Sequence, residues 1–354
     1  MRNVRKFKLP LLYVNHVGAQ TELIFDGGSA AINKEGEIFY ELKYFEEDFA
    51  VFDFDSKTNS LQYNVQKEKM KTPTTDTEKI YSALIMGIRD YFRKQNFAKA
   101  ILGLSGGIDS ALVTCLAADA LGPENVHVIL MPSEFSSAGS VDDSLELIKN
   151  TGVSHDLIPI KNIFDQHIAA LKPVFKELPF SVAEENLQAR IRAALLMAES
   201  NKFGYILLNT SNKSEMAVGF GTLYGDMCGG ISVLGDVYKT QVYELAQYVN
   251  RNKKIIPEKI ISKAPSAELR PNQKDSDSLP DYDILDKILF QYIECKKGPD
   301  EIIAMGFEKD LVKRILKMVN TNEYKRYQTP PILRVSPKAF GMGRRLPIVG
   351  KYLS

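Results

Sequence analysis

The segment Gly103-Leu104-Ser105-Gly106-Gly107-Ile108-Asp109-Ser110 joins a short apolar stretch, 99–104, to a stretch with a helical pattern, 109–121. Its two adjacent glycines allow positive φ angles and let backbone N–H groups approach a ligand closely. The start of the helix adds unpaired N–H donors and the positive end of its dipole, so an anion is the natural ligand. Asp109 could hold a cation that bridges phosphate oxygens. The segment therefore predicts a phosphate-binding turn, which differs from a Walker loop because no Gly-Lys-Ser/Thr follows.

Strands and helices are expected to alternate after this turn. The predicted strands are 126–131, 156–160 and 205–208, and the predicted helices are 140–149, 182–202, 239–250, 282–294 and 308–324. Strands that alternate with helices imply right-handed βαβ units. The predicted fold class is therefore α/β, an open parallel sheet with helices on both faces. Ligands of such sheets bind beyond the carboxyl ends of the strands, where 103–110 would lie.

The first 65 residues have a different pattern, which predicts a short β-rich segment before the α/β part. Apolar and polar residues alternate there, and glycine-containing turns separate them. The strands are expected at 11–14, 22–25, 37–41 and 49–52. Residues 66–78 are polar and contain a proline, so they are expected to link this segment to a helix that runs to Gln95.

The composition excludes several classes of protein. The chain has 354 residues with 45 basic and 44 acidic side chains, which argues against a dedicated nucleic-acid binder. Three cysteines without CxxC spacing argue against a disulfide framework and a zinc ribbon, and the four histidines form no i,i+4 pair of metal ligands. No apolar run of about 18 residues and no signal peptide are present, so no membrane segment is expected and the predicted location is the cytoplasm.

The turn at 103–110 resembles the pyrophosphate-binding loop of the N-type ATP pyrophosphatases, which have an adenine nucleotide alpha-hydrolase-like fold. This family includes GMP, asparagine and NAD synthetases, whose members cleave ATP to AMP and pyrophosphate and activate an acceptor as its adenylate. The resemblance implies that ATP contacts Gly103, Leu104, Ser105, Gly106, Gly107, Ile108, Asp109 and Ser110. The loop by itself does not choose among the members.

Later segments of the chain resemble NAD synthetases in particular. The matching segments are 185–192, 207–215, 219–226, 239–242, 265–269 and 323–326. The resemblance implies further ATP contacts at Thr210, Lys239 and Ser266, where the small ammonia-dependent enzymes have threonine in place of Ser266. It implies Mg²⁺ ligands at Asp109 and Glu215, with Asp109 and Lys239 as catalytic residues. It implies contacts to deamido-NAD by Asn186, Arg190, Glu215, Phe220, Gly221, Thr222, Leu223 and Lys325.

The function implied by this resemblance is that of a carbon–nitrogen ligase. Deamido-NAD would be amidated to NAD through an adenylate, with ATP and Mg²⁺ as cofactors, ammonia or glutamine as nitrogen donor, and AMP and pyrophosphate as products. The family site is shared between subunits, so a homodimer or higher homo-oligomer is expected. Because water must be kept from the adenylate, a closing loop is expected at 133–142 or 268–280.

Residues 14–20 and 23–29 resemble late strands of the nitrilase-type glutaminase domain that precedes the synthetase in glutamine-dependent NAD synthetases. The expected organisation is a glutaminase remnant at 1–65, a linker at 66–78, a synthetase domain at 79–325 and a tail at 326–354. The catalytic Glu, Lys and Cys of that glutaminase normally lie upstream of this stretch. We therefore expect this chain alone to use ammonia without glutaminase activity, and a separate glutaminase subunit is a further partner to consider.

Two alternatives remain open at this point. One is another ATP pyrophosphatase, such as a GMP synthetase or a tRNA-modifying enzyme, against which 186–190 and 220–223 argue. The other is a truncated, non-catalytic protein that binds nucleotides. The intact set of Asp109, Thr210, Glu215 and Lys239 argues against the second alternative.

Overall fold

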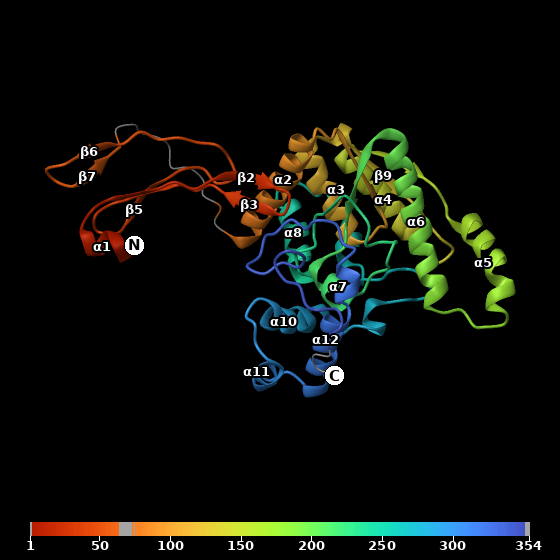
Figure 1. The fold of residues 1–354 in the computed structure, drawn as a ribbon. Coiled ribbons are helices and arrows are strands. Elements are labelled where there is room, and N and C mark those ends of the chain that lie inside the picture. Colours follow the sequence, from red (N-terminus) through yellow and green to blue (C-terminus); the bar gives the residue numbers. More distant parts are fainter. Residues whose placement is uncertain (1, 64–72, 74, 351–354) are drawn as a thin grey trace. The chain divides into compact units, whose positions relative to one another are not determined.

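The computed structural model describes residues 2–63, 73 and 75–350. These residues form two compact units, Met1–Tyr91 and Phe92–Ser354 (Figure 1). Most of the expected linker at 66–78, and the last four residues of the expected tail, lie outside the described residues.

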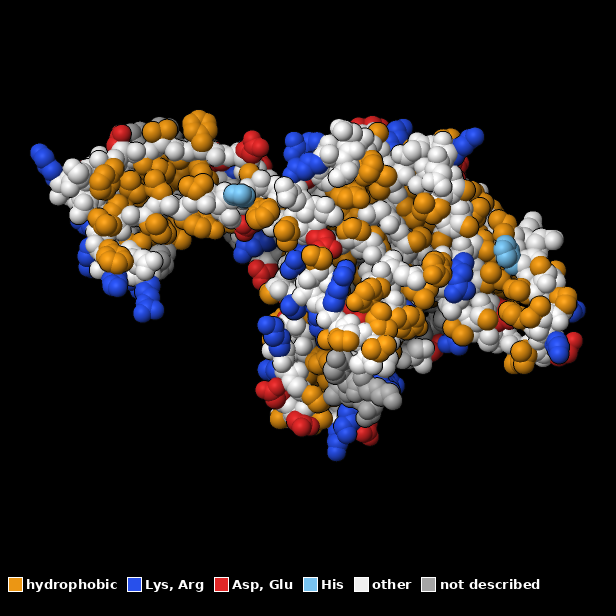
Figure 2. Space-filling view, in the orientation of Figure 1, with side chains coloured by type: hydrophobic (Ala, Val, Ile, Leu, Met, Phe, Trp, Pro, Cys, Tyr) orange, Lys and Arg blue, Asp and Glu red, His pale blue; other side chains and the backbone are white. Residues whose placement is uncertain are grey.

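The first unit consists mainly of short antiparallel strands, as its alternating pattern predicts. After helix α1 (Arg2–Phe7), the strands are β1 (Leu11–Tyr13), β2 (Val17–Gln20), β3 (Leu23–Asp26), β4 (Ala30–Ile32), β5 (Ile38–Glu41), β6 (Asp53–Asp55) and β7 (Ser60–Gln62), followed by helix α2 (Asp76–Gln95). They form a three-stranded sheet, β1-β4-β5, and the hairpins β2-β3 and β6-β7. Many apolar side chains of this unit are exposed, which Figure 2 shows as orange patches over its strands.

The second unit is built on a five-stranded parallel sheet in the order β10-β9-β8-β11-β12. The strands are β8 (Lys99–Gly103), β9 (Val126–Leu130), β10 (Ser154–Leu157), β11 (Tyr205–Asn209) and β12 (Ile231–Ser232). The chain passes outward from β8 to β10 and then returns to the other side of β8 at β11. The strand order therefore reverses between β8 and β11, which is the point where open α/β sheets bind ligands.

Helices cover both faces of this sheet, so the predicted fold class is confirmed. The helices are α3 (Ile108–Leu121), α4 (Ala138–Thr151), α5 (Lys161–Phe175), α6 (Val182–Phe203), α7 (Lys213–Val218), α8 (Lys239–Val249) and α9 (Glu258–Ser262). On one face, α3 packs on β8 and β9 and also contacts α4 and α8. On the other, α6 packs on β8 and β11 and is covered by α5. Ile101, Ile129 and Leu207 face α6, because alternate residues of a strand point to opposite faces.

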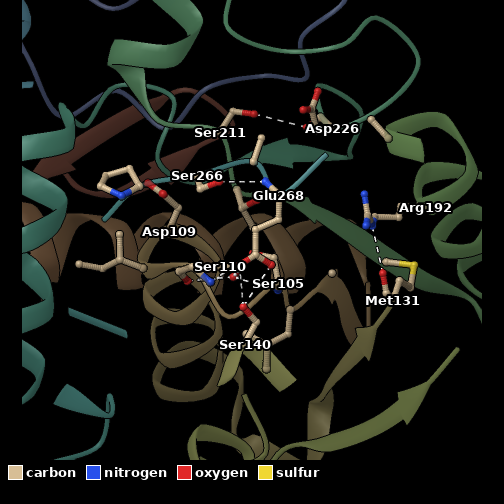
Figure 3. Close-up of a pocket in the computed structure, with 18 of the residues that line it drawn as sticks. Ser105, Asp109, Ser110, Met131, Ser140, Arg192, Ser211, Asp226, Ser266 and Glu268 are labelled. Atoms are coloured by element: carbon tan, nitrogen blue, oxygen red, sulfur yellow. Dashed lines mark hydrogen bonds between the residues drawn. The ribbon is translucent and has the colours of Figure 1, made fainter. Parts of the chain in front are cut away.

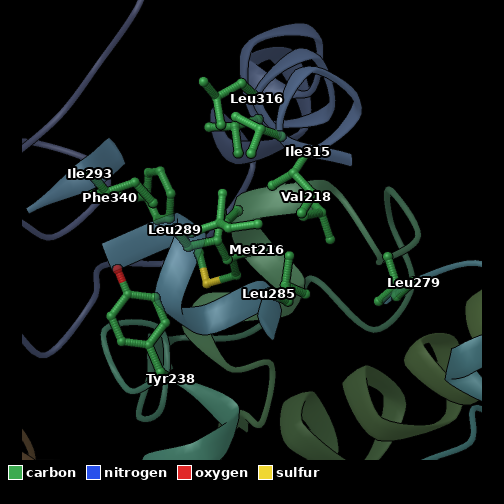
Figure 4. Packing of buried hydrophobic residues seen from close by; sticks show 14 of the residues in the cluster. Met216, Val218, Tyr238, Leu279, Leu285, Leu289, Ile293, Ile315, Leu316 and Phe340 are labelled. Atoms are coloured by element: carbon green, nitrogen blue, oxygen red, sulfur yellow. The ribbon is translucent and has the colours of Figure 1, made fainter. Parts of the chain in front are cut away.

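The carboxyl-terminal part adds a helical layer around its own apolar cluster. Its helices are α10 (Tyr282–Ile293), α11 (Pro299–Ala304), α12 (Lys309–Thr321) and α13 (Glu323–Arg326). Figure 4 shows Leu285 and Leu289 of α10 packed with Met216 of α7 and Ile315 of α12. The amphipathic repeats of α10 and α12 therefore meet over α7, which carries part of the candidate site.

Some predicted elements differ from the structure. The strand predicted at 156–160 is formed instead by Ser154–Leu157, since Pro159 has no N–H for the ladder. No strand forms at 49–52, where Phe49 and Val51 are exposed, and helix α5 was not predicted. Among the described residues, no helix is both long and apolar enough to cross a membrane.

Candidate active site

The Gly loop, residues 103–110, leaves the carboxyl end of β8 and leads directly into α3, as predicted. Gly106 has φ = +78°, and a Cβ atom there would lie 2.6 Å from the carbonyl oxygen of Ser140. Only glycine therefore fits, because any side chain would meet the backbone of Ser140 in the first turn of α4. Inside the turn, Ser110 Oγ donates to Gly107 O at 3.0 Å, which holds the first turn of α3 against the loop.

A cavity of about 290 Å³ opens above this loop (Figure 3). Of the predicted site residues, it is lined by Gly103, Leu104, Ser105, Gly107, Ile108, Asp109, Ser110, Thr210, Glu215, Phe220, Lys239 and Ser266. These residues come from the Gly loop and the start of α3, the loop after β11, α7 and the segment after it, the start of α8 and the segment after α9. The fold thus brings the predicted ATP and metal residues together at the cavity, with the exception of Gly106. That glycine instead allows the loop to pass close to the backbone of Ser140.

Three predicted residues meet in one charged cluster at this cavity. The ammonium of Lys239 contacts the carboxylate of Asp109 and lies 3.7 Å from Oε1 of Glu215. Asn212 Nδ2 donates to Asp109 Oδ1 at 2.9 Å and so orients that carboxylate. The cluster holds two carboxylates and one ammonium, so it has an excess of acceptor oxygens that a further cation could use.

Burial and neighbouring charges both shift the pKa values of Glu215 and Lys239 in this cluster. Burial and the charge of Asp109 raise the pKa of Glu215 to about 8, although Lys239 opposes the shift. Burial alone would lower the pKa of Lys239, but the charges of Asp109 and Glu215 outweigh it and raise the pKa above its ordinary value. Lys239 is therefore a permanent cation at neutral pH, whereas Glu215 needs a second cation to remain ionised.

The start of α8 places Lys239 by a chain of hydrogen bonds. The backbone N–H of Lys239 donates to Ser214 Oγ at 2.9 Å, and Ser214 Oγ in turn donates to Asp286. Asp286 also accepts from the N–H of Thr240 at 2.9 Å. Asp286 lies on α10. This helix of the carboxyl-terminal layer therefore helps to position Lys239, the first residue of α8.

The predicted deamido-NAD residues form a second group, most of which does not line the cavity. Thr222 Oγ1 donates to Asn186 Oδ1 at 2.7 Å, and Arg190 Nε donates to Leu223 O at 3.1 Å. Lys325 Nζ donates to Gly221 O at 2.9 Å. These side chains tie α6 and α13 to the segment 219–223. Only Phe220 and Glu215 of that predicted set reach the cavity itself.

Five charged residues of the cavity were not predicted as site residues: Arg192, Asp226, Lys263, Glu268 and Asp275. Arg192 Nε donates to Met131 O at 3.1 Å, and burial lowers the pKa of its guanidinium to about 10 while leaving it charged at neutral pH. Burial raises the pKa of Asp226, against the opposing charges of Lys325 and Arg192. The signal for Arg192 was present, since 189, 192, 193 and 196 share one face of α6 and all line the cavity.

The two segments expected to contain a closing loop are joined by a polar contact at the cavity. Lys263 Nζ donates to Glu268 Oε1 at 2.7 Å and to Ser140 Oγ at 2.5 Å. Ser140 Oγ also lies 3.0 Å from Glu268 Oε1. We call Ser140, Lys263 and Glu268 the latch, because they connect the segment after β9 with the segment after α9 beside the Gly loop.

Comparisons with known proteins show the family of the chain. The family model described as NAD synthase matches residues 80–329. A glutamine-dependent NAD(+) synthetase of Synechocystis sp. is 50% identical over 346 residues, which cover 98% of this chain and 62% of that protein. The chain thus spans less than two thirds of the length of this curated relative.

Two solved structures are also similar to the chain. A glutamine-dependent NAD+ synthetase from Acinetobacter baumannii, in complex with adenosine diphosphate, has a TM-score of 0.70 and 42% identity over 98% of this chain and 63% of that one. An NH3-dependent NAD synthetase from Campylobacter jejuni has a TM-score of 0.58 and 30% identity over 74% of this chain and 100% of that one. With the family match extending over most of the second unit, the chain belongs to the NAD synthase family.

Proposed function

We propose that this chain amidates deamido-NAD to NAD through an adenylate, as a carbon–nitrogen ligase that uses ATP and ammonia. The observation that carries the proposal is the Lys239–Asp109–Glu215 cluster beside the Gly loop, in a cavity at the switch point of the sheet. A buried ammonium, acceptor oxygens for a metal and a helix start that binds anions are the groups that a transferring polyphosphate requires. Family membership and the ADP complex of the Acinetobacter baumannii relative support ATP as the nucleotide.

The chemistry has two steps. A carboxylate oxygen of the nicotinate group attacks the α-phosphorus of ATP, and the bond to the bridging oxygen of the β-phosphate breaks, so pyrophosphate leaves into the Gly loop. Lys239 stabilises the charge that develops on the phosphate oxygens, and backbone N–H groups of the loop bind the leaving pyrophosphate. Ammonia then attacks the carboxyl carbon of the adenylate, and AMP leaves with the electron pair of the carbon–oxygen bond.

The donor set fits Mg²⁺, with Asp109 and Glu215 as the residues that would hold it. Both are oxygen ligands, which Mg²⁺ prefers, and burial together with the charge of Asp109 raises the pKa of Glu215, so a bound cation would favour its ionised form. The ion would neutralise polyphosphate oxygens during transfer.

Asp226 is the proposed acceptor for the proton that the attacking ammonia loses. It lines the cavity, and its Oδ1 accepts the N–H of Thr222 at 2.6 Å, which holds the carboxylate in place. A raised pKa makes a carboxylate a stronger base, so it is better suited to take a proton at neutral pH. Arg192 would face the anionic groups of the substrate from α6.

The latch supports a closing role for 133–142 and 268–280. Closure of these segments over bound ATP would keep water from the adenylate, whose hydrolysis would waste the nucleotide. The latch crosses the cavity next to the Gly loop, where closure would act directly on the phosphates.

We also propose a homodimer or higher homo-oligomer. Exposed apolar side chains gather on α5, on α6 and on the loop between them, as Figure 2 shows over that part of the second unit. Those around the loop between the two helices are Val174, Leu178, Phe180 and Val182. A patch of this kind marks an interaction surface, and α6 also carries Asn186 and Arg190.

For domain organisation, we propose a synthetase domain at 79–325 after a glutaminase-derived segment at 1–65. The family match at 80–329 and the exposed apolar strands of the first unit support this division. Glutamine would then serve as nitrogen source only where a complete glutaminase supplies ammonia.

One assay tests the proposed function against its alternatives. The chain is incubated with ATP, Mg²⁺ and ammonium, and with either deamido-NAD or xanthosine monophosphate, and the amidated product and AMP are quantified. We expect NAD and AMP in equal amounts from deamido-NAD. Amidation of xanthosine monophosphate alone would identify a GMP synthetase activity, and ATP binding without AMP formation would identify a non-catalytic nucleotide-binding protein.

A parallel arm replaces ammonium with glutamine. We expect no glutamate to be released by the purified chain. Release of glutamate would contradict the ammonia-dependent part of the proposal and leave the amidation itself untouched.

A further inference from the structure

Three side chains of types that can bind a metal ion, those of His127, Asp156 and Glu199, converge beside β9 and β10. None of them lines the cavity of the candidate active site. Nε2 of His127 lies 3.2 Å from Oδ2 of Asp156 and 3.5 Å from Oε2 of Glu199. The three ligand atoms all lie within 4.8 Å of one another. His127 is near the start of β9, Asp156 is on β10, and Glu199 is in the last turns of α6.

Hydrogen bonding determines which nitrogen of His127 carries the proton in its neutral form. Ser154 Oγ donates to the carbonyl oxygen of Val126 at 3.2 Å. Its only proton is thereby used, so Ser154 Oγ accepts from the Nδ1–H of His127, which lies 2.9 Å away. The lone pair of Nε2 then points toward the two carboxylates. A histidine oriented by a hydrogen bond from its other nitrogen is the usual arrangement of a metal ligand.

The resulting cluster contains three acceptors and no donor between them. Oε2 of Glu199 is buried and has no hydrogen-bond partner among the described residues. A nitrogen lone pair and two carboxylate oxygens at these distances repel one another unless a cation lies between them. Burial and the charge of Asp156 raise the pKa of Glu199, and His127 opposes that shift.

The two distances that start from Nε2 of His127 suit a tetrahedral metal ion. Ligands at the bond lengths typical of zinc, about 2.0–2.1 Å, stand about 3.4 Å apart at the corners of a tetrahedron. The distances from Nε2 to the two carboxylate oxygens, 3.2 and 3.5 Å, agree with that value. A nitrogen ligand favours a transition ion over Mg²⁺, and two carboxylates balance the charge of a divalent ion.

The cluster also has an entry path and a position separate from the cavity. The side chain of Asp156 is 62% exposed, while those of His127 and Glu199 are 13% and 17% exposed. None of the three residues lines the cavity, and Glu199 lies three residues beyond Leu196, the last cavity-lining residue of α6, about 4.5 Å along the helix axis. An ion could therefore enter past Asp156 without passing through the candidate active site.

We propose that His127, Asp156 and Glu199 bind a divalent transition metal ion of the zinc type, with water in the fourth position. The ion links β9, β10 and α6 and stabilises that side of the sheet. The proposed metal site is independent of the proposed amidation activity, and it can be tested without any assay of amidation.

The test is a titration of chelator-treated chain with Co²⁺ and Zn²⁺ in excess Mg²⁺, which occupies the oxygen ligands Asp109 and Glu215. We expect the chain to bind one equivalent of Co²⁺, with the visible absorption of a tetrahedral ion, and Zn²⁺ to displace it. Zn²⁺ should also raise the melting temperature of the chain.

Variants of the ligands test the assignment. Asp156→Asn, at an exposed position, should weaken metal binding at least about tenfold, and Ser154→Ala should weaken it about tenfold because the imidazole of His127 is no longer held by a hydrogen bond. Glu199→Gln is a second ligand variant, and His155→Asn on the same strand is the matched control.

Two results would overturn the proposal. One is Co²⁺ binding that is equal in the chain, in Asp156→Asn and in Glu199→Gln. The other is a His127 ring that stays doubly protonated at neutral pH in NMR spectra and does not respond to Zn²⁺. The proton would then be the cation of the cluster.

Discussion

Two lysines of the second unit, Lys213 and Lys239, have closely similar settings and different exposure to the cavity. Each is the first residue of a helix, α7 or α8, and each contacts two carboxylates. Each ammonium also lies near a tyrosine ring, 4.8 Å from that of Tyr238 for Lys213 and 5.5 Å from that of Tyr282 for Lys239. The local sequence pattern gives no reason to assign them different roles, and only the family resemblance singles out Lys239.

Their hydrogen bonds distinguish them. Lys213 is completely buried and donates to Glu294, to Ser336 Oγ at 2.9 Å and to Lys338 O at 3.0 Å, so its three donors are used. Its second acid, Asp236, also accepts the backbone N–H groups of Val335 and Ser336. Lys213 therefore fastens the carboxyl-terminal segment to the helical layer and has no donor left for a ligand.

Lys239 differs because it lines the cavity and Glu215, its second acid, is 3.7 Å away. A phosphate oxygen could therefore replace part of its present contacts. A buried lysine–acid cluster is therefore structural when the protein satisfies every donor of the ammonium, and it is suited to a ligand when a donor is still available. Substitutions at Lys213 and Lys239 should separate an effect on stability from an effect on catalysis.

The largest expected effect is on folding, from Lys213→Met. Removing one partner of a buried ion pair leaves uncompensated charge and costs about 3–5 kcal/mol of the free energy of unfolding. Urea unfolding at neutral pH measures this loss. Adding Glu294→Gln to Lys213→Met should recover part of it, and a stability within about 0.5 kcal/mol of the unsubstituted chain would contradict the structural role.

Next in size is the effect of Lys239→Met on catalysis. Loss of one group that stabilises developing charge lowers kcat by about 10²–10³-fold. Steady-state rates of AMP formation with ammonium measure this, and the folded fraction is followed by circular dichroism. Lys239→Arg keeps the charge and serves as the control. Unchanged kcat in a folded Lys239→Met chain would place the phosphate-binding cation elsewhere.

A smaller effect is expected on Mg²⁺ affinity as the pH changes. Below its pKa of about 8, Glu215 is protonated, so Mg²⁺ must displace that proton in order to bind. Apparent affinity should rise with pH by up to about tenfold per unit and level off above the pKa. Calorimetric titrations between pH 6 and 9 measure the slope. Glu215→Gln should bind more weakly with little pH dependence, and an equal slope in both chains would show that another group titrates.

The smallest effect is expected at the latch. Ser140→Ala removes one hydrogen bond to Lys263, worth about 0.5–1.5 kcal/mol, so KM for ATP should rise about twofold to tenfold. Ser262→Ala, at the exposed neighbour of Lys263, is the matched control. A larger change in the control than in Ser140→Ala would mean that the latch does not act on ATP.

The sequence predicted best those elements that depend on local pattern. Continuous apolar runs predicted β8, β9 and β11, and adjacent glycines between a strand and a helix predicted the Gly loop. Strand β10 was predicted two residues too late, because Ser154 and His155 at its start are exposed and polar and become a strand by pairing with β9. Of the predicted site residues, the ATP set meets at the cavity, whereas most of the deamido-NAD set holds segment 219–223 in place.

The α/β class, the phosphate-binding turn and the family resemblance could all be predicted from the sequence, since they depend on residues close together in the chain or on an ordered series of motifs. Tertiary structure alone decided which charges become neighbours. Arg192, Asp226 and Glu268 reach one cavity from separate elements, and His127, Asp156 and Glu199 meet although no histidine spacing predicts a metal site. The physical reason is that electrostatic energy depends on distance through space and on burial. Neither quantity can be read from separation along the chain.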